Sequence, residues 1–191
     1  QIYQWNAEGL VERGRFDEAV DMMNKARELD PLSLFMNARL GKVLYYARQY
    51  EAAKNVLNAT LEVDPDYSQA RYFLSLVYSA EERYEEALEI LPGGSYRAWA
   101  AILHAWNGDT EKAREMMDEV LARGSENYDW PAVRASFHFA LGELDRCFKW
   151  MNRAVDVKDP RLLNLIRSPK TDAIKDDPRF LAVLERMGLE P

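Results

Sequence analysis

His104 and His138 are the two histidines of the chain, and histidine can act as a metal ligand, a general base or a proton shuttle. They lie thirty-four residues apart, at positions assigned below to the same place in successive repeats. A zinc site would need further ligands that converge on these side chains. We therefore favour packing between helices over a metal site for both histidines.

Cys147 and three pairs of neighbouring carboxylates could also support nucleophilic or acid–base chemistry. Cys147 occupies a small position of the repeat pattern and has no activating partner beside it, so we expect a buried thiol. The carboxylate pairs are Glu81-Glu82, Glu85-Glu86 and Asp176-Asp177. Each pair falls in a turn or at the start of an expected helix, where the helix dipole favours negative charge.

The sequence contains no glycine-rich phosphate loop, zinc-binding helix or nucleophile elbow. We therefore predict no catalytic residue, no metal ligand and no cofactor site, and we predict that this chain is not an enzyme. An enzyme whose site is built from residues scattered along the sequence is the remote alternative.

Charge and composition limit the partners further. Lys and Arg number 25 against 32 Asp and Glu, a net charge of −7, which argues against a nucleic-acid surface and against anionic membranes. A single cysteine cannot form an intramolecular disulfide, and no apolar run is long enough to cross a bilayer. Because the chain begins at Gln1 rather than Met, we interpret it as part of a longer protein. We favour a cytoplasmic location, with a periplasmic domain as the alternative.

The residues that could bind a partner are positioned by a repeat of thirty-four residues. The stretch 14–31 returns as 48–65, Phe16 corresponds to Tyr50, and both stretches close with Asp-Pro. A period of this length is typical of stacked helical hairpins.

Three series of positions follow this repeat through five copies. A small residue lies in the middle of each second helix, at Ala19, Ala53, Ala87, Ala113 and Cys147. Twelve positions earlier lies a small residue of the first helix, at Ala7, Gly41, Ser75, Ala101 and Ala135. Four positions after the first series lies a large apolar residue, at Met23, Leu57, Leu91, Met117 and Met151. The small pairs allow two antiparallel helices to cross closely, and the large residues fill the space between layers.

The pattern predicts an all-α right-handed superhelix of about five helical hairpins with C-terminal capping helices. The hairpins are expected at about 1–33, 34–67, 68–93, 94–127 and 128–161, and the capping helices at 162–191. In the first hairpin the helices are expected at 2–12 and 16–29, joined by Gly14 in the left-handed conformation. The third hairpin is eight residues short, because Pro92-Gly93-Gly94 interrupts its second helix.

These residues resemble the tetratricopeptide repeat over about residues 1–160. The first two copies carry the family pattern well, at Gly14, Phe16, Ala19, Ala26 and Pro31 and at Leu40, Gly41, Tyr50, Ala53 and Pro65. The tryptophan often found early in the first helix is replaced by Tyr3, Asn37 and Arg71, and the later copies are degenerate.

The resemblance implies a groove, lined by the first helices, that binds an extended peptide or a helix. The expected groove residues are Gln4, Glu8, Phe35, Lys42, Tyr45, Tyr46, Tyr72, Leu76 and Trp106. Aromatic residues bury much area at low entropic cost, so they are good anchors, although they could instead pack within the array or against the tail. Relatives that clamp a C-terminal carboxylate use basic and amide residues where this chain has Gln4, Glu8, Tyr72 and Leu76. A partner bound through a free C-terminus is therefore not expected.

Residues 171–189 resemble the closing segment of tetratricopeptide regions in bacterial regulatory proteins, including class III adenylate/guanylate cyclases and winged-helix transcriptional regulators. This resemblance implies a regulatory or sensory region of a larger bacterial signalling protein, associated with an adenylate cyclase or a similar domain. The partner would then be a protein or peptide, including another domain of the same parent. Self-association that makes the parent a homodimer is the alternative, with 92–94 and the tail as contact regions.

Overall fold

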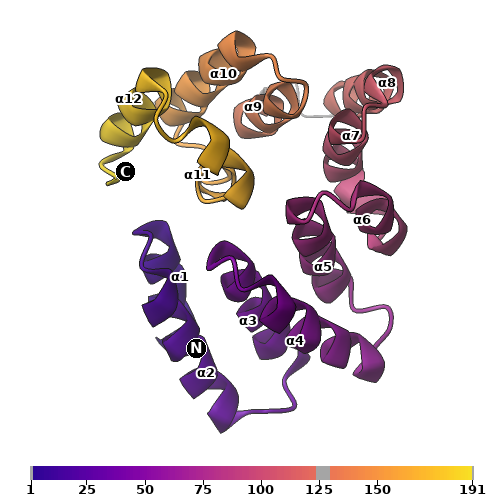
Figure 1. The fold of residues 1–191 in the computed structure, drawn as a ribbon, viewed down its shortest axis with the longest axis vertical. Helices are drawn as coiled ribbons and strands as arrows, with labels where there is room; N and C mark the ends of the chain where they lie inside the picture. Colours follow the sequence, from indigo (N-terminus) through magenta and orange to yellow (C-terminus); the bar gives the residue numbers. More distant parts are fainter. Residues whose placement is uncertain (1, 124–129, 191) are drawn as a thin grey trace. The chain divides into compact units, whose positions relative to one another are not determined.

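The computed structural model describes residues 2–123 and 130–190, apart from the side chains of residues 2–5 and Ser95 (Figure 1). The described residues form helices and turns, without a β-strand among them, which confirms the predicted all-α array of hairpins with C-terminal capping helices. Residues 1–92 and 93–191 form two compact units, called unit 1 and unit 2 below. The division falls after the third expected hairpin.

Unit 1 consists of three hairpins, and its first two helices have the bounds expected from the sequence. In chain order the helices are α1 (Ile2–Glu12), α2 (Phe16–Leu29), α3 (Leu34–Tyr46), α4 (Tyr50–Val63), α5 (Ser68–Ala80) and α6 (Tyr84–Ile90). In unit 2 the described elements are η1 (Gly94–Tyr96), α7 (Arg97–Trp106), α8 (Thr110–Ala122), α9 (Pro131–Ala140), α10 (Leu144–Asp156), α11 (Leu162–Ile166), η2 (Pro169–Ile174) and α12 (Pro178–Met187).

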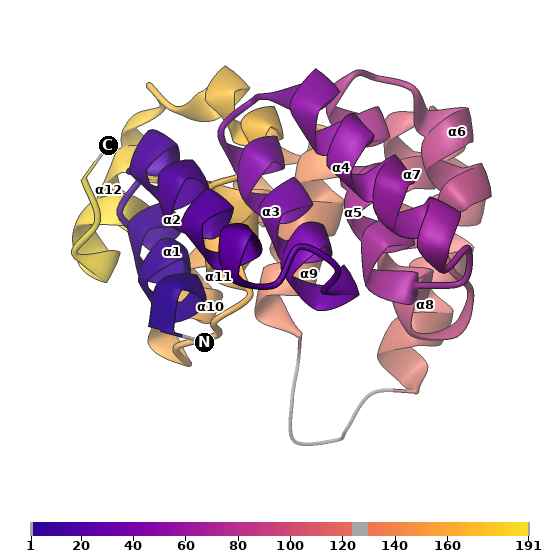
Figure 2. The same ribbon diagram turned by 90° about the horizontal axis from the view of Figure 1, so that it is seen from below.

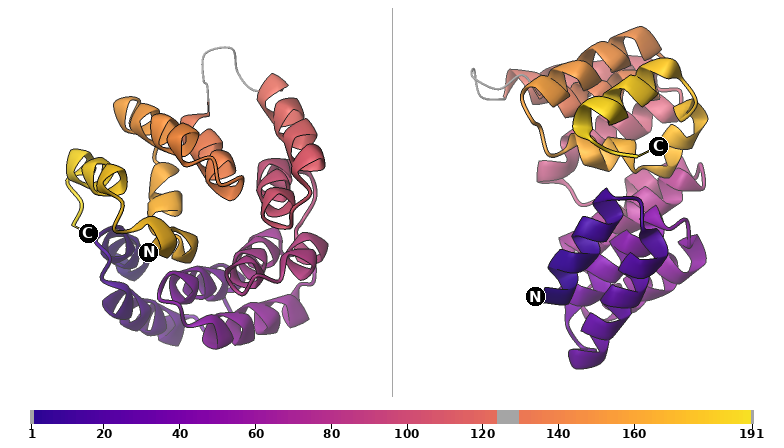
Figure 3. Two further views of the ribbon diagram at one scale, coloured as in Figure 1. Left: turned by 45° about the horizontal axis from the view of Figure 1, so that its top comes forward. Right: turned by 90° about the vertical axis from the view of Figure 1, so that its left-hand side faces the viewer.

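The first helices of successive hairpins contact one another within each unit. Helix α3 contacts both α1 and α5 in unit 1, and α7 contacts α9 in unit 2. The second helices α2 and α4 pack against their own partners and against the first helix of the next hairpin. Unit 1 is therefore built in two layers, with α1, α3 and α5 in one and α2 and α4 in the other (Figure 3).

The small positions predicted from the repeat lie where the paired helices cross. All five small residues of the second helices, including Cys147, are fully buried. A Cβ atom placed on Gly41 would lie only 2.5 Å from the Leu57 side chain, so a side chain at this point of α3 would force Leu57 of α4 to move. The small residues of the repeat pattern thus mark the points at which the paired helices cross.

The third hairpin departs from the series of large apolar residues. Helix α6 ends at Ile90, and Leu91, expected to fill the space between layers, lies outside the helix and is partly exposed. Proline lacks a backbone N–H, and the residue before it disfavours helical angles, so Leu91 adopts an extended conformation ahead of Pro92. The expectation that Leu91 is a core residue is wrong for this reason.

The turns inside the hairpins require a left-handed residue. Gly14, Gly108 and Gly142 adopt positive φ angles of 75°, 89° and 72°, as expected for Gly14 and its equivalents. Arg48 and Glu82 hold the same place in the second and third hairpins, with φ angles of 59° and 62°. The repeat geometry therefore imposes the left-handed conformation even where the residue is not glycine.

The C-terminal segment covers the last hairpin of unit 2. Pro169 begins η2 and Pro178 begins α12, each after a capping residue: the Ser168 hydroxyl accepts a hydrogen bond from Lys170 N, and the Asp177 carboxylate accepts one from Arg179 N at 2.8 Å. Phe180, Val183 and Leu184 of α12 share one buried cluster with α9, α10 and α11. This cluster closes the apolar surface that the last repeat would otherwise expose.

A buried carboxylate that the sequence pattern did not single out holds the start of α9. The Asp159 side chain is fully buried and accepts hydrogen bonds from the backbone N–H of Ala132, at 3.2 Å, and of Arg161, at 3.1 Å. These bonds satisfy a donor that α9 leaves unpaired at its first turn. Asp159 could have been identified from the sequence. Asp-Pro pairs end the first two repeats, and Asp159-Pro160 is the corresponding pair of the last repeat, displaced by one residue.

Candidate partner-binding face

The nine groove residues expected from the sequence fall on the first helices of the hairpins, as the repeat pattern required. In unit 1, α1 carries Gln4 and Glu8, α3 carries Phe35, Lys42, Tyr45 and Tyr46, and α5 carries Tyr72 and Leu76. These helices lie side by side in Figure 2. Trp106 lies on α7 in unit 2. The side chain of Gln4 lies outside the described part of the structure.

Four residues form a stripe along α3 at successive helical turns: Phe35, Arg39, Lys42 and Tyr46. Spacings of three and four residues place side chains on one face of a helix. The Arg39 guanidinium lies 5.3 Å from the centroid of the Phe35 ring, and the Lys42 ammonium lies 5.7 Å from that of Tyr46. This α3 stripe therefore has two cations in the middle and an aromatic ring at each end, and each cation contacts the ring next to it.

Lys42 is also held by the neighbouring hairpin. Its ammonium lies 5.9 Å from the ring centroid of Phe73 on α5, so it is flanked by two aromatic rings. Burial lowers the pKa of Lys42, and the positive charge of Arg39 lowers it further, while Glu8 acts in the opposite direction. The side chain thus carries its charge in a place where water screens it poorly.

Arg39 is a residue of this face that was not singled out from the sequence. It forms an ion pair with Glu8 of α1, with 3.1 Å between Arg39 Nη1 and Glu8 Oε1. The Arg39 Nε atom is buried and has no hydrogen-bond partner among the described residues. Its position three residues before Lys42 was a usable signal, because both residues must share a helix face.

Burial divides the expected aromatic anchors into two groups. Phe35 is 38% exposed, and Tyr72 is partly exposed. Tyr45 and Tyr46 are buried, with their ring centroids 5.1 Å apart, and burial raises the pKa of Tyr46 well above its ordinary value. Leu76 is buried as well, so direct contact of these three with a partner stays a prediction, and their present role is packing.

Trp106 belongs to a separate aromatic cluster in unit 2. Its ring packs edge-on against Trp99, with centroids 5.5 Å apart, and the Lys170 ammonium of the C-terminal segment lies 5.4 Å from its centroid. The segment after the last hairpin therefore contacts Trp106, as in the alternative left open by the sequence. A partner contact at this residue stays a prediction.

The residues that could have supported catalysis are engaged in structural interactions. His104 Nδ1 lies 3.2 Å from Asp109, and His138 Nδ1 lies 2.8 Å from Glu143, at equivalent turns of two hairpins. Burial raises the pKa of the Cys147 thiol to about 12, which keeps it protonated. No group of three or more histidine, cysteine or acidic residues in the described ranges 2–123 and 130–190 could hold a metal ion.

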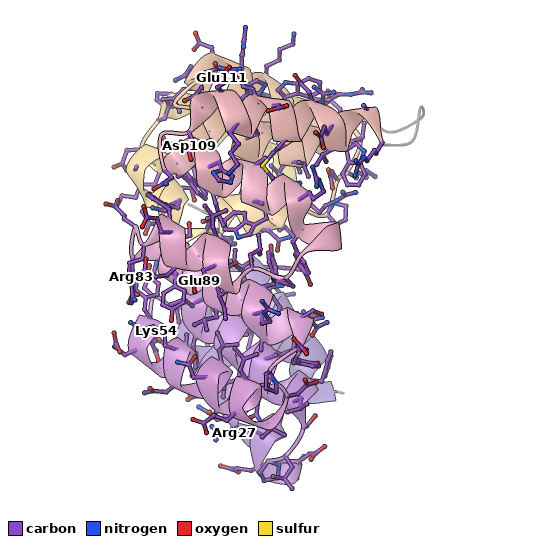
Figure 4. The ribbon with its side chains drawn as sticks, turned by 90° about the vertical axis from the view of Figure 1, so that its right-hand side faces the viewer. Arg27, Lys54, Arg83, Glu89, Asp109 and Glu111 are labelled. Carbon is purple, nitrogen blue, oxygen red and sulfur yellow. The ribbon has the colours of Figure 1, made fainter. Side chains whose placement is uncertain are left out.

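The second helices carry a different kind of surface. Lys54 on α4 forms ion pairs with Glu51, at 2.6 Å, and with Glu81, at 2.7 Å, and Arg83 pairs with Glu86. Figure 4 labels Lys54 and Arg83 among the charged side chains of these helices. Basic and acidic groups here satisfy one another, in contrast to the α3 stripe.

Comparisons with known proteins agree on the tetratricopeptide repeat. Residues 38–91 match the tetratricopeptide repeat family model. The TPR repeat-containing protein YpiA of Bacillus subtilis (strain 168) is 30% identical over 131 residues, which cover 63% of this chain and 30% of YpiA. The chain thus spans less than a third of the length of this relative.

A solved structure extends the likeness to almost the whole chain. It is a tetratricopeptide repeat protein from Parabacteroides merdae ATCC 43184, with a TM-score of 0.51 and 15% sequence identity over 99% of this chain and 79% of that chain. At this level of identity the likeness concerns the fold. The fold is that of a tetratricopeptide-like helical solenoid, an architecture that generally mediates protein–protein interactions and is typically non-catalytic. None of the described helices is long and apolar enough to cross a membrane.

Proposed function

We propose that this chain is a protein–protein interaction module that binds a segment of a partner protein on the face formed by α1, α3 and α5. The supporting observation is the α3 stripe, in which the partly exposed Phe35 ring lies beside the Arg39 guanidinium, with Lys42 further along the same helix. An exposed aromatic ring supplies binding energy through buried area, and neighbouring charges orient the partner. The adjoining, partly exposed Tyr72 on α5 widens the apolar part of this face.

Selection of peptides from a phage-displayed random library, followed by titration of the synthetic peptides, tests this function. Phe35→Ala and Tyr72→Ala are each expected to weaken binding by about tenfold or more, because each removes a ring from the face. Val157→Ala is the matched control, since Val157 is 38% exposed, like Phe35, and follows α10 in unit 2. Failure to select any peptide, or an equal loss with Val157→Ala, would contradict the proposal.

Self-association is a second candidate, supported by a different surface. Leu29 and Val63 end the second helices of the first two hairpins, and Leu32 follows in the loop; they are 74%, 72% and 88% exposed. Exposed apolar side chains that lie together as a patch are typical of contact surfaces. Sedimentation over a wide concentration range should then show a mass above the 22.1 kDa monomer that Leu32→Ser returns to the monomer. A constant monomer mass would rule out this candidate.

We further propose that the array serves as the regulatory region of a larger bacterial signalling protein. The resemblance of residues 171–189 to the closing segments of such regions supports this context. The full-length gene product is then expected to carry a catalytic or DNA-binding domain before the array. A gene product with neither domain would contradict the proposed context and leave the binding function untouched.

A further inference from the structure

The two cations of the α3 stripe have few acidic side chains as ion-pair partners. Lys42 forms no ion pair with a carboxylate among the described residues, and its ammonium faces the rings of Tyr46 and Phe73. Arg39 has one acidic partner, Glu8, whose side chain is 45% exposed. Two positive charges therefore share a single, partly exposed carboxylate.

Elsewhere in unit 1, the positive charge of a comparable lysine is neutralised by two ion pairs. The Lys54 side chain is 15% exposed and pairs with both Glu51 and Glu81. The chain as a whole carries a net charge of −7, so acidic residues are in excess and could have been placed beside Lys42. A partly buried cation without a counter-ion costs free energy, which an anionic ligand would recover.

We propose that Arg39 and Lys42 bind an acidic side chain, aspartate or glutamate, of an extended partner peptide, while Phe35 contacts an apolar side chain of the same peptide. This assignment rests on the function proposed above and names the chemistry of the partner. Arg39 contributes planar N–H donors and Lys42 a compact charge, and both can donate hydrogen bonds to one carboxylate. The flanking rings limit access of water, which strengthens the attraction between the charges.

The partner carboxylate comes from a side chain rather than from a free C-terminus. A bound C-terminus also presents its backbone N–H and its last side chain, which need polar partners and a closed pocket nearby. The group that faces Lys42 from α5 is instead the Phe73 ring, whose centroid lies 5.5 Å from that of Tyr72. Such surroundings suit a continuing chain with apolar side chains.

The spacing along α3 sets the spacing in the peptide. Phe35 and Lys42 are seven residues apart on a helix that rises 1.5 Å per residue, which gives a separation of about 10 Å. A peptide in the polyproline II conformation advances about 3.1 Å per residue and repeats its side-chain direction every three residues. An acidic residue three positions from a large apolar residue therefore matches the stripe.

Two sets of capped peptides test the proposal directly. One set carries a glutamate three residues from a leucine in otherwise random sequence, and the second set replaces that glutamate with glutamine. We expect the protein to bind the glutamate set about tenfold more tightly. Lys42→Met should abolish this preference, and Lys42→Arg should retain it, because the arginine restores the charge.

Lys25→Met is the matched control, because Lys25 is an exposed lysine on the second helix α2. It removes the same charge from the chain and should leave the preference for glutamate intact. Glu8→Gln should increase affinity for the glutamate set, since it releases Arg39 and removes a like charge. Thermal unfolding of each variant separates a lost contact from a lost fold.

The outcomes distinguish this proposal from the function on which it rests. Equal binding of both sets, lost with Phe35→Ala, would overturn the acidic-peptide assignment and leave the binding face in place. Binding of neither set, together with failed selection from the random library, would overturn both. Binding only of uncapped peptides through their C-terminus would overturn the assignment to a side-chain carboxylate.

Discussion

At the scale of single residues, Cys147 shows how burial decides reactivity. Its side chain is fully buried, and burial raises its pKa to about 12, so the reactive thiolate is scarce at neutral pH. We expect an aromatic disulfide reagent at pH 8 to modify the native protein far more slowly than the protein in denaturant. Rapid modification of the folded chain would contradict a buried thiol at this position.

Gly41 is the residue at which helix packing leaves least space. Because an added Cβ would lie 2.5 Å from the fully buried Leu57, Gly41→Ala should force the side chain of Leu57 or helix α4 to move. Overpacking of this kind costs about 1–3 kcal/mol, which exceeds the gain in helix propensity of about 1 kcal/mol. A lower free energy of unfolding in a urea titration is the expected result.

Gly9→Ala is the control for Gly41→Ala, because Gly9 is also helical but has no atom within 4 Å of an added Cβ. It should leave stability unchanged or raise it by up to about 1 kcal/mol. Stabilisation by Gly41→Ala of the same size as by Gly9→Ala would show that the helices do not cross so closely.

Residues at crossing points could be predicted from the sequence, whereas the exposure of the aromatic residues could not. The repeat spacing places Phe35, Tyr45 and Tyr46 on the first helix of a hairpin, but it does not show how far the neighbouring hairpin covers each ring. Phe35 begins its helix and stays partly exposed, while the two tyrosines end it and are buried. Arg39 could have been identified from its position three residues before Lys42, but its ion pair with Glu8 of α1 leaves no trace in the repeat pattern.

At the scale of helices, Glu143 links parts of two adjacent hairpins in unit 2. It precedes α10, contacts His138 of α9 at 2.8 Å and pairs with Arg114 of α8 at 2.6 Å. The hydrogen bond from Arg114, together with His138 and the charge of Arg146, lowers the pKa of Glu143 to about 2. The ionised carboxylate therefore stabilises the contact between these hairpins.

Glu143→Gln should lower the free energy of unfolding at neutral pH by about 1 kcal/mol, given the partial exposure of the groups involved. A carboxylate whose pKa falls on folding contributes stability that is present above its unfolded pKa of about 4.5 and is lost as the pH falls through about 2. The difference between variant and unchanged protein should therefore shrink between pH 4.5 and pH 2. Glu115→Gln, at an exposed position of α8, should show no such difference.

Helix bounds followed well from local signals. The first two helices agree with their expected limits, and η2 and α12 begin at prolines that follow the capping residues Ser168 and Asp177. Local side-chain caps and proline geometry act within one helical turn, so the sequence carries them directly. The short α6 was expected to be irregular, but the repeat spacing still placed Leu91 in the core, where the local effect of Pro92 excludes it.

At the scale of the whole chain, the sequence predicts the solenoid and the presence of a cap, since each hairpin exposes an apolar face that the next must cover. The two compact units divide after Pro92, shortly after the end of the shortened α6 at Ile90. In a repeat array each hairpin is stabilised chiefly by its neighbours, so the loss of one interface propagates only to adjacent hairpins. A substitution that destabilises the C-terminal cap should therefore lower the stability of unit 2 more than that of unit 1.

Phe180→Ala tests this locality. Phe180 of α12 is 4% exposed within the cluster that joins α9, α10 and α11, and truncation of a buried phenylalanine costs about 3–5 kcal/mol. Hydrogen exchange followed by mass spectrometry should show faster exchange in α9–α12 and little change in α3 and α4. Leu181→Ala, at the adjacent 38% exposed position, removes a similar apolar group without opening the cluster and should change neither region. When each hairpin is coupled only to its nearest neighbours, one part of the array can unfold without the rest. If Phe180→Ala instead accelerated hydrogen exchange to the same extent in both units, the chain would unfold as a single cooperative body.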